Sequence, residues 1–466
     1  MGDLFSLLSL GANALSAHRA ASSTASHNLA NANTPGYSRQ RANLEAVLPA
    51  YRLGGSFFGR GVSLNSVSQA RDFGAERQFA LANEARARNE AQAGALESLA
   101  ALDPQASGAI GSQLADFYAS MRALQQNPGD LSLRQSAIGQ SRALALAFNR
   151  TAAGIAGARD SIDTRLSSQV SEVNELATQM ANLNQQIRVA RGSGAEPNDL
   201  LDARQAVQDR LGQLVGATAI PTAEGDVNLA LPGGTTIVNG ELAGQLSTVP
   251  DATNGGHLGV RLTRPDGTGQ VSVSTFGGEW GGMLSARDGA LKAAETALDT
   301  LAFDWAGSVN TVHRSGFALD GSTGRDLFDA GAQGGAAGRI TVNAALLANP
   351  SLLAASSSAT TLPGDGNNLQ LLIGTETAAL SNGLNALQGF AGIVASYGAA
   401  AGQARAAADA DAAIFDYATG LRESVSGVSI DEEIVELTKA QRGFEAVMKV
   451  IQTTDEMLNT LMQLKA

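Results

Sequence analysis

The longest helical pattern in the chain runs from about residue 131 to residue 191. Inside it, eight positions follow one another in steps of four and three, and seven of them are apolar: Ile162, Leu166, Gln169, Val173, Leu176, Met180, Leu183 and Ile187. This spacing predicts one apolar seam along a long, rod-like helix. A coiled-coil partner and the core of a helix bundle would both require such a seam, so the pattern leaves both open.

The composition favours elongated helices over one large globule. The 466 residues allow two to four domains, at roughly 100–200 residues per domain. Much of the apolar content is alanine, and aromatic residues make up only 5% of the chain. Alanine buries little apolar area per residue, so we expect long helices that lie closely side by side.

Other periodic segments surround this helix. We expect further helices at residues 3–31, 73–102, 111–126, 198–215, 282–313, 377–422 and 430–462. Alternating patterns with many glycines predict an extended or hairpin segment at 40–72 and a β-rich insertion at 217–280. Residues 316–375 are rich in Gly, Asp and Asn and are expected to be irregular. The predicted fold class is therefore mainly α with a β-rich insertion.

Both ends of the chain carry an apolar stripe with little beside it to bury that stripe. In the first helix, Leu8, Leu15 and Leu29 share one heptad position, although a glycine and a histidine interrupt the stripe. Near the other end, a capping box at 429–432 opens a helix with the same spacing of four and three. We expect each stripe to be buried by the opposite end of the chain and by neighbouring copies.

This layout divides the chain into paired outer and inner segments. Residues 1–40 and 429–466 form the two halves of a coiled-coil-like inner α domain, 41–216 and 281–428 form a helical rod domain, and 217–280 form a small β-rich outer domain.

The first helix stops sharply within the stretch "SHNLANANTPGYSRQ", residues 26–40. Pro35 cannot continue a helix and pushes Thr34 to an extended conformation, while Gly36 tolerates a positive φ. The three asparagines either cap and hydrogen-bond this exit or simply end the helix, and the sequence alone weighs the two equally.

Several classes of function conflict with the sequence. A net charge of −12 without a basic stripe argues against binding nucleic acid. No run of about 18 apolar residues is present, so we expect no membrane insertion. Residues 4–17 could pass for a signal-peptide core, but basic residues are missing before them and Asp3 is present, so we expect no cleaved signal.

The sequence also lacks a persuasive catalytic or metal-binding motif. There is no cysteine, and no H-E-x-x-H, G-x-S-x-G or Walker motif occurs. The loops that begin at Asp320 and Asp365 start like calcium loops but lack the required glycine at their sixth position. We therefore expect no enzyme activity, no cofactor and no metal.

Four stretches resemble a known family. The first is "ASHNLANANTPGYSRQ", and the second is the C-terminal "SVSGVSIDEEIVELTKAQRGFEAVMKVIQTTDEMLNTLMQL". The others are "GGMLSARDGALKAAETALDTLAFDWAGSVNTVHRSGFALDGSTGRDLF" (281–328) and, more loosely, "GRGVSLNSVSQARD" (59–72). Together they resemble the flagellar rod, hook and hook-associated axial proteins, and the "YSRQ" ending is most like that of the members at the hook–filament junction. Residues 217–280 lie outside the resemblance.

The resemblance implies a structural protein of the bacterial flagellum, exported unfolded and without a cleaved signal to the hook–filament junction outside the cell. Implied partners are identical subunits in a ring, the hook protein, hook-associated protein 3, and an export chaperone at the C-terminal segment. The terminal helices would order on assembly, so that folding and binding are coupled. The expected assembly residues are Leu8, Leu15, Asn28, Leu29, Asn31, Asn33, Thr34, Pro35, Gly36, Tyr37, Ile434, Leu437, Phe444, Met448, Ile451 and Leu458.

Two other interpretations stay open. One is a sister axial protein, either hook-associated protein 3 or a flagellin-like protein, although the 281–328 stretch argues against it. The other is a secreted enzyme or glycan-binding protein in which the β-rich insertion binds a ligand through its loops.

Overall fold

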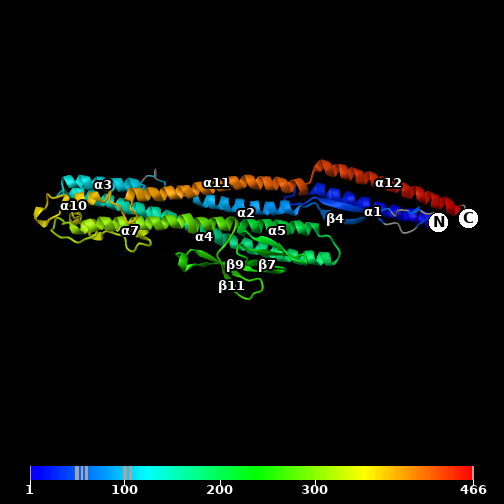
Figure 1. Ribbon diagram of the computed structural model, residues 1–466, viewed down its shortest axis with the longest axis horizontal. Helices are drawn as coiled ribbons and strands as arrows, with labels where there is room; N and C mark the ends of the chain where they lie inside the picture. Colours follow the sequence, from blue (N-terminus) through cyan, green and yellow to red (C-terminus); the bar gives the residue numbers. More distant parts are fainter. Residues whose placement is uncertain are drawn as a thin grey trace.

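The chain forms a long rod of helices with a β-rich bulge on one side, and both termini lie at the same end of the rod (Figure 1). The structure is a computed structural model that describes residues 2–47, 52–53, 56–57, 61–97, 102–103, 106 and 108–463. The main helices are α1 (Gly2–Ala30), α2 (Phe73–Leu96), α3 (Ile110–Gln126), α4 (Leu131–Gly192), α5 (Asn198–Val215), α6 (Gly278–Ser285), α7 (Lys292–Ser315), α10 (Asn367–Gly374), α11 (Ala386–Ser426) and α12 (Ile430–Gln463).

The seam on α4 is the core of a helix bundle and of the bulge, not one side of a two-helix coiled coil. Six of its seven apolar positions are buried and Leu176 is half-buried, and the helix packs on α3, α5, α7 and strands of the bulge. Gln169, the one polar residue in the pattern, is hydrogen-bonded to α6. Its amide oxygen accepts from Trp280 Nε1 at 2.8 Å, and its Nε2 donates to Glu279 at 2.9 Å. The bundle-core alternative is therefore the one that the structure shows.

The β-rich bulge consists of two antiparallel sheets that lie along α4. The first has the order β5-β6-β7-β8 (Thr218–Pro221, Val227–Ala230, Thr236–Asn239, Leu242–Ala243), and the second has the order β11-β10-β9 (Gln270–Val273, Leu258–Thr263, Gln245–Pro250). Two α4 asparagines bond to these strands. Asn174 bonds to both the N–H and the carbonyl of Leu246, and Asn184 does the same with Val227. These contacts fix the bulge to the rod.

The segment after α1 is a hairpin, as its alternation predicts. Strand β1 (Gln40–Ala46) pairs antiparallel with β4 (Val62–Gln69), and a bulge follows Asn43. The two-residue strands β2 (Arg52–Leu53) and β3 (Ser56–Phe57) pair between them. The hairpin contacts α1 and leads the chain from the terminal helix to the start of the rod.

Several predicted boundaries differ from the observed ones. Helix α2 ends at Leu96 instead of near residue 102. The helix predicted at 282–313 begins earlier, at Gly278, and contains a π-helical turn, Ala286–Leu291. Helix α11 begins only at Ala386, because Asn385 caps it together with Gln388. The region 316–375, predicted to be irregular, holds short pieces: β12 (Phe328–Asp329), α8 (Ala336–Arg339), β13 (Thr341–Val342), α9 (Ala344–Ala348) and α10.

A small second core lies where α2 and α11 approach the terminal helices. The rings of Phe79 and Phe415 are 5.3 Å apart, and a guanidinium stacks on each: Arg422 at 3.4 Å from the Phe79 centroid and Arg86 at 4.2 Å from that of Phe415. Arg422 also bonds to Asp209 of α5. Stacked cations of this kind stabilise contacts between helices, so this core fixes the end of α11 from which α12 departs.

Candidate functional site

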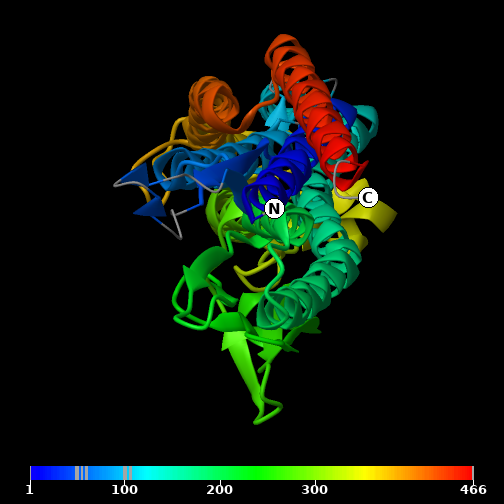
Figure 2. The ribbon, with the colours of Figure 1, turned by 90° about the vertical axis from the view of Figure 1, so that its right-hand side faces the viewer.

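Helices α1 and α12 lie side by side at one end of the rod (Figures 1 and 2). On α12 the buried and half-buried positions that face α1 follow steps of four and three: Glu433, Leu437, Ala440, Phe444, Val447, Ile451, Thr454 and Leu458. On α1 the fully buried positions are small residues and one amide: Gly11, Ala14, Ala17, Ala25 and Asn28. Small side chains on α1 let the larger ones of α12 approach closely.

The structure brings only part of the expected residues into this contact. Leu437, Phe444, Ile451 and Leu458 lie on the α12 positions that face α1. The three leucines expected on α1 (Leu8, Leu15 and Leu29) are half-buried beside the seam of small residues. Ile434 and Met448 are exposed and lie outside this series of positions. The apolar residues of the terminal helices therefore serve two faces, one inside the pair and one outside it.

A glycine on each helix receives a side chain from the other. A β-carbon at Gly11 would stand 2.7 Å from Cγ1 of Ile451, so Ile451 would have to shift to admit a side chain there. In the same way, the ring of His18 fills the space in which a β-carbon of Gly443 would lie. The glycine and histidine that break the leucine stripe on α1 are thus points of closest approach.

The turn by which the chain leaves α1, residues 31–36, is held by local hydrogen bonds. Asn31 Nδ2 donates to the carbonyl of His27 at 3.0 Å, and Asn31 Oδ1 accepts from the Thr34 hydroxyl at 3.2 Å. Gly36 has a φ of +78°, which favours glycine. Pro35 and Asn33 are exposed. This part of the stretch acts as a helix stop, with Asn31 as its local cap.

Asn28 has a larger role, because its side chain connects three parts of the chain. It is 1% exposed, and its amide forms four hydrogen bonds. Nδ2 donates to the carbonyl of Gln40 (2.8 Å) and to Glu433 Oε2 (2.9 Å), while Oδ1 accepts from the Tyr37 hydroxyl (2.8 Å) and from the Gln40 N–H (2.9 Å). An amide has two donors and can accept at least two bonds. Every polar position of Asn28 is thus occupied.

Arg39 completes the connection to α12. Its Nε donates to Glu433 Oε1 and its Nη1 to Glu432 Oε2, both at 2.7 Å. Its backbone N–H donates to the carbonyl of Ser426, the last residue of α11. Glu433 is 3% exposed, and a buried carboxylate needs this pairing with a cation. We call Asn28, Tyr37, Arg39 and Glu433 the latch.

The latch is also fixed to the rod through α5. The Ser38 N–H donates to Asp202 of α5, and Arg71, which follows β4, bonds to both Ser38 and Asp202. The Tyr37 hydroxyl lies 3.0 Å from His27 Nδ1. Burial raises the pKa of Tyr37, and the nearby carboxylates, Asp199 first among them, raise that pKa further. The Tyr37 hydroxyl therefore stays protonated and donates a hydrogen bond to Asn28 Oδ1.

Sequence reasoning missed Arg39 and Glu433. In the sequence, Glu433 directly follows the capping box at 429–432, and Arg39 is part of the YSRQ ending. Their separation of 394 positions carries no local signal. A hint was present, however, since Glu433 occupies a seam position of α12 at which an unpaired charge would be costly.

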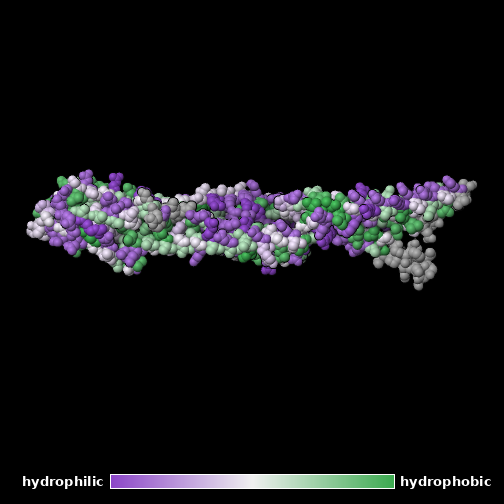
Figure 3. Space-filling view, turned by 90° about the horizontal axis from the view of Figure 1, so that it is seen from above, coloured by the Kyte–Doolittle hydropathy of each residue, from purple (hydrophilic) through white to green (hydrophobic). Residues whose placement is uncertain are grey.

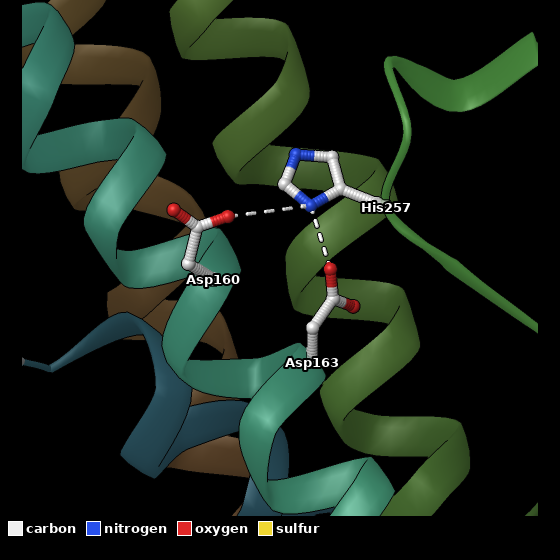
Figure 4. A group of neighbouring side chains, drawn as sticks. All are labelled: Asp160, Asp163 and His257. Carbon is white, nitrogen blue, oxygen red and sulfur yellow. Dashed lines mark hydrogen bonds and ion pairs between the residues drawn. The ribbon is translucent and has the colours of Figure 1, made fainter. Parts of the chain in front are cut away.

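A second polar cluster lies between α4 and the bulge (Figure 4). His257 Nδ1 is 2.7 Å from Asp163 Oδ2 and 3.8 Å from Asp160 Oδ1. The Leu258 N–H also donates to Asp163 Oδ2, and Arg287 bonds to the other oxygen, Oδ1. Both oxygens of Asp163 are therefore occupied by protein donors. This cluster is an ion-pair contact between the bulge and the rod, and its donor set does not suit a cation.

The chain matches known flagellar proteins along most of its length. The family described as "Flagellar hook-associated protein FlgK helical domain" matches residues 96–328. The chain belongs to this family of flagellar hook-associated proteins. The descriptions "Flagella basal body rod protein" and "Flagellar basal body rod FlgEFG protein C-terminal" match residues 8–37 and 423–464, so both terminal helices carry the signature of flagellar axial proteins.

Individual relatives agree with this family. Flagellar hook-associated protein 1 of Bacillus subtilis is 29% identical over 506 residues, which cover 98% of either chain. The protein of the same name from Escherichia coli is 30% identical over 338 residues, 70% of this chain and 60% of its own length. The flagellar hook junction protein FlgK from Burkholderia pseudomallei has a similar fold, with a TM-score of 0.64 at 19% identity, over 74% of this chain and all of that one.

Family membership confirms the main functional prediction over its alternatives. The chain is a structural component of the bacterial flagellum, of the kind found at the hook–filament junction, and it assembles with other flagellar proteins. The interpretation as hook-associated protein 3 or a flagellin is not supported, because the matching family is that of hook-associated protein 1. Among the described residues, no helix has the length and apolar character needed to cross a bilayer.

Proposed function

We propose that this chain builds the junction between hook and filament through coupled folding and assembly of α1 and α12. The observation that carries this proposal is the outer face of α12. Val450, Met457, Leu461 and Met462 are all exposed there, although the inner face already covers α1. An apolar face of this kind on a soluble chain indicates a partner surface.

The latch supports the coupling. Neither terminal helix buries its seam alone, because α1 contacts mainly α12 and the β1–β4 hairpin. The latch forms only when Asn28 and Glu433 meet, so one helix cannot be held in place without the other. In the free chain both ends are then poorly ordered, and they become ordered when neighbouring copies cover the outer face of α12.

The partners, location and domain division that we propose are those that the family resemblance and the sequence layout imply. The partners are identical subunits in a ring, the hook protein, hook-associated protein 3, and an export chaperone that binds the C-terminal segment. The protein works outside the cell after export without a cleaved signal, and its role is structural rather than catalytic. The inner domain consists of 1–40 and 429–466, the rod of 41–216 and 281–428, and the outer domain of 217–280. The assembly residues named from the sequence are proposed to act in the contacts between subunits.

The decisive experiment is docking of the purified chain onto isolated hooks. A chain without residues 429–466 should dock at background level. Ile451→Asp, which places a carboxylate against Gly11, should reduce docking at least tenfold, whereas the adjacent exposed change Gln452→Asp should dock like the unchanged chain. Undiminished docking by the truncated chain would refute the proposal.

Limited proteolysis of the free chain tests the coupling separately. Both ends should be cleaved before the rod and should become resistant once the chain is docked. Terminal segments that resist cleavage as firmly as α4 in the free chain would show that ordering precedes assembly.

A further inference from the structure

The start of α12 presents its apolar side to solvent and its acidic side chain to the interior. Glu433 is buried in the latch, whereas Ile430, Ile434 and Val435 are exposed, and so is Val425 at the end of α11. We call these four apolar residues the elbow patch, and Figure 3 shows the apolar surface over this joint. A helix whose apolar side faces outward is partnered on that side.

A second exposed apolar stripe lies on the first turns of α2. Phe73 is 89% exposed and Leu81 is 61% exposed, and Arg77 lies between them at the same spacing of four. The opposite side of α2 holds Ala75 and Phe79, which are buried in the rod. We call Phe73, Arg77 and Leu81 the α2 stripe. An aromatic ring beside an arginine is typical of the residues that anchor protein interfaces.

The two surfaces have matching charges. Arg77 forms no ion pair or hydrogen bond with any residue that the structure describes. Asp431, which lies one turn before Val435 on the elbow side of α12, is likewise free of such partners in the described part of the chain. One surface therefore carries an unpaired cation among apolar groups, and the other an unpaired anion.

The two surfaces also lie at one level of the rod. Helix α2 begins, and α11 gives way to α12, near the same point along the long axis (Figure 1). Within one chain both surfaces stay exposed, so neither covers the other. A contact between two different surfaces of identical subunits is heterologous, and its repetition gives a ring when the rotation closes and an open helical array when it does not.

We infer that the elbow patch of one copy docks on the α2 stripe of a second copy, with Asp431 of the first facing Arg77 of the second. This contact rests on the proposed function and deepens it, since it names which surfaces of identical subunits meet. Phe73 is its aromatic anchor, packed against Ile434 and Val435 of the neighbour.

Cysteine cross-linking tests the contact directly, because the chain has no cysteine of its own. Equal amounts of Phe73→Cys and Val435→Cys chains are docked together onto hooks and oxidised. A disulfide-linked dimer of the two variants is expected in the docked material and not in the free mixture. Val189→Cys, at a position on α4 that is 68% exposed, replaces Phe73→Cys as the control and should give no dimer with Val435→Cys.

A charge exchange provides the second test. Arg77→Asp and Asp431→Arg should each reduce docking of the full chain at least fivefold, and the double variant should recover most of it. Helix content by circular dichroism shows that each variant is folded. If the unchanged chain docks but no dimer forms, or if the double variant is as weak as the singles, this contact is wrong and the proposed function stands. A cross-link to a protein of another mass assigns the elbow patch to a different partner and also overturns the inference. Failure of the unchanged chain to dock contradicts the proposed function itself.

Discussion

The imidazole ring of His18 on α1 occupies the place of the missing side chain at Gly443 on α12. About two helical turns further along α12, the relation is reversed, because Ile451 of α12 lies against Gly11 of α1. The two contacts lock the helices from both sides. A shift of either helix by one turn would set both large side chains against a residue with a β-carbon, so the pair has one register.

The first prediction concerns this lock. Gly11→Ala adds about 1 kcal/mol of helix propensity, but overpacking against Ile451 costs typically 1–3 kcal/mol. We expect a net loss of about 1 kcal/mol in the α1–α12 pair, measured as faster hydrogen exchange of both helices in docked material. Gly157→Ala, on an open face of α4, should instead stabilise the rod by about 0.5–1 kcal/mol.

A double-mutant cycle separates contact from propensity at the other glycine. Gly443→Ala should weaken the pair in the presence of His18 and strengthen it in a His18→Ala background, since the ring is then gone. The same effect in both backgrounds would mean that His18 does not fill this space.

The second prediction concerns the latch. Asn28→Asp removes both donors, leaves the Gln40 carbonyl unpaired and sets a carboxylate beside Glu433. Unsatisfied buried groups cost about 1–3 kcal/mol each, so we expect the latch to lose about 3 kcal/mol, and exchange in α1 and α12 to rise roughly a hundredfold. Asn33→Asp, an exposed change in the same turn, is the matched control and should leave exchange unchanged.

The third prediction concerns the contact between the bulge and the rod. Asp163→Asn removes a carboxylate that pairs with Arg287 and His257, and breaking a buried pair of this kind costs about 3 kcal/mol. Asp160→Asn, one turn earlier on α4 and with a side chain 73% exposed, should cost less than about 0.5 kcal/mol. Urea unfolding followed by tryptophan fluorescence measures both, and similar losses in the two variants would contradict this assignment.

The fourth prediction is a dependence on alkaline pH. Tyr397 on α11 donates to the carbonyl of Leu96 at the end of α2, and burial raises the pKa of Tyr397 to about 12. In the unfolded chain the same group ionises near pH 10. Its contribution to stability is therefore complete below pH 10 and is lost as the pH rises to about 12. Tyr397→Phe should flatten the fall of the unfolding free energy in this window, and parallel curves would show that Tyr397 does not take part.

Much of the fold follows from local patterns. The apolar spacing from Ile162 to Ile187 predicts helix α4, and Pro35 and Gly36 predict the end of α1. Both follow from local sequence, because heptad spacing and backbone sterics act within a few residues. The bundle role of α4 did not follow, since a coiled coil requires the same seam. The start of α11 was missed because its cap depends on Asn385 and Gln388, which the wider apolar pattern concealed.

The site was less predictable than the fold. The search for large apolar residues selected Leu437, Phe444, Ile451 and Leu458 on α12, which lie half-buried at positions that face α1. The same criterion selected leucines on α1, where alanines and a glycine form the contact surface. A search for apolar residues overlooks such a surface, because its value lies in how closely it lets the partner approach. The latch is harder still to predict, since 394 positions separate Arg39 from Glu433 in the sequence.

The hydrogen bonds of Asn28 also make the packing of the first helix depend on the last one. One of the four hydrogen bonds of this amide, near the start of the chain, is accepted by the Glu433 carboxylate, 405 positions further along the chain. A copy that breaks off before α12 lacks the carboxylates that accept from Asn28 Nδ2 and pair with Arg39, and its first helix keeps the β1–β4 hairpin as its main contact.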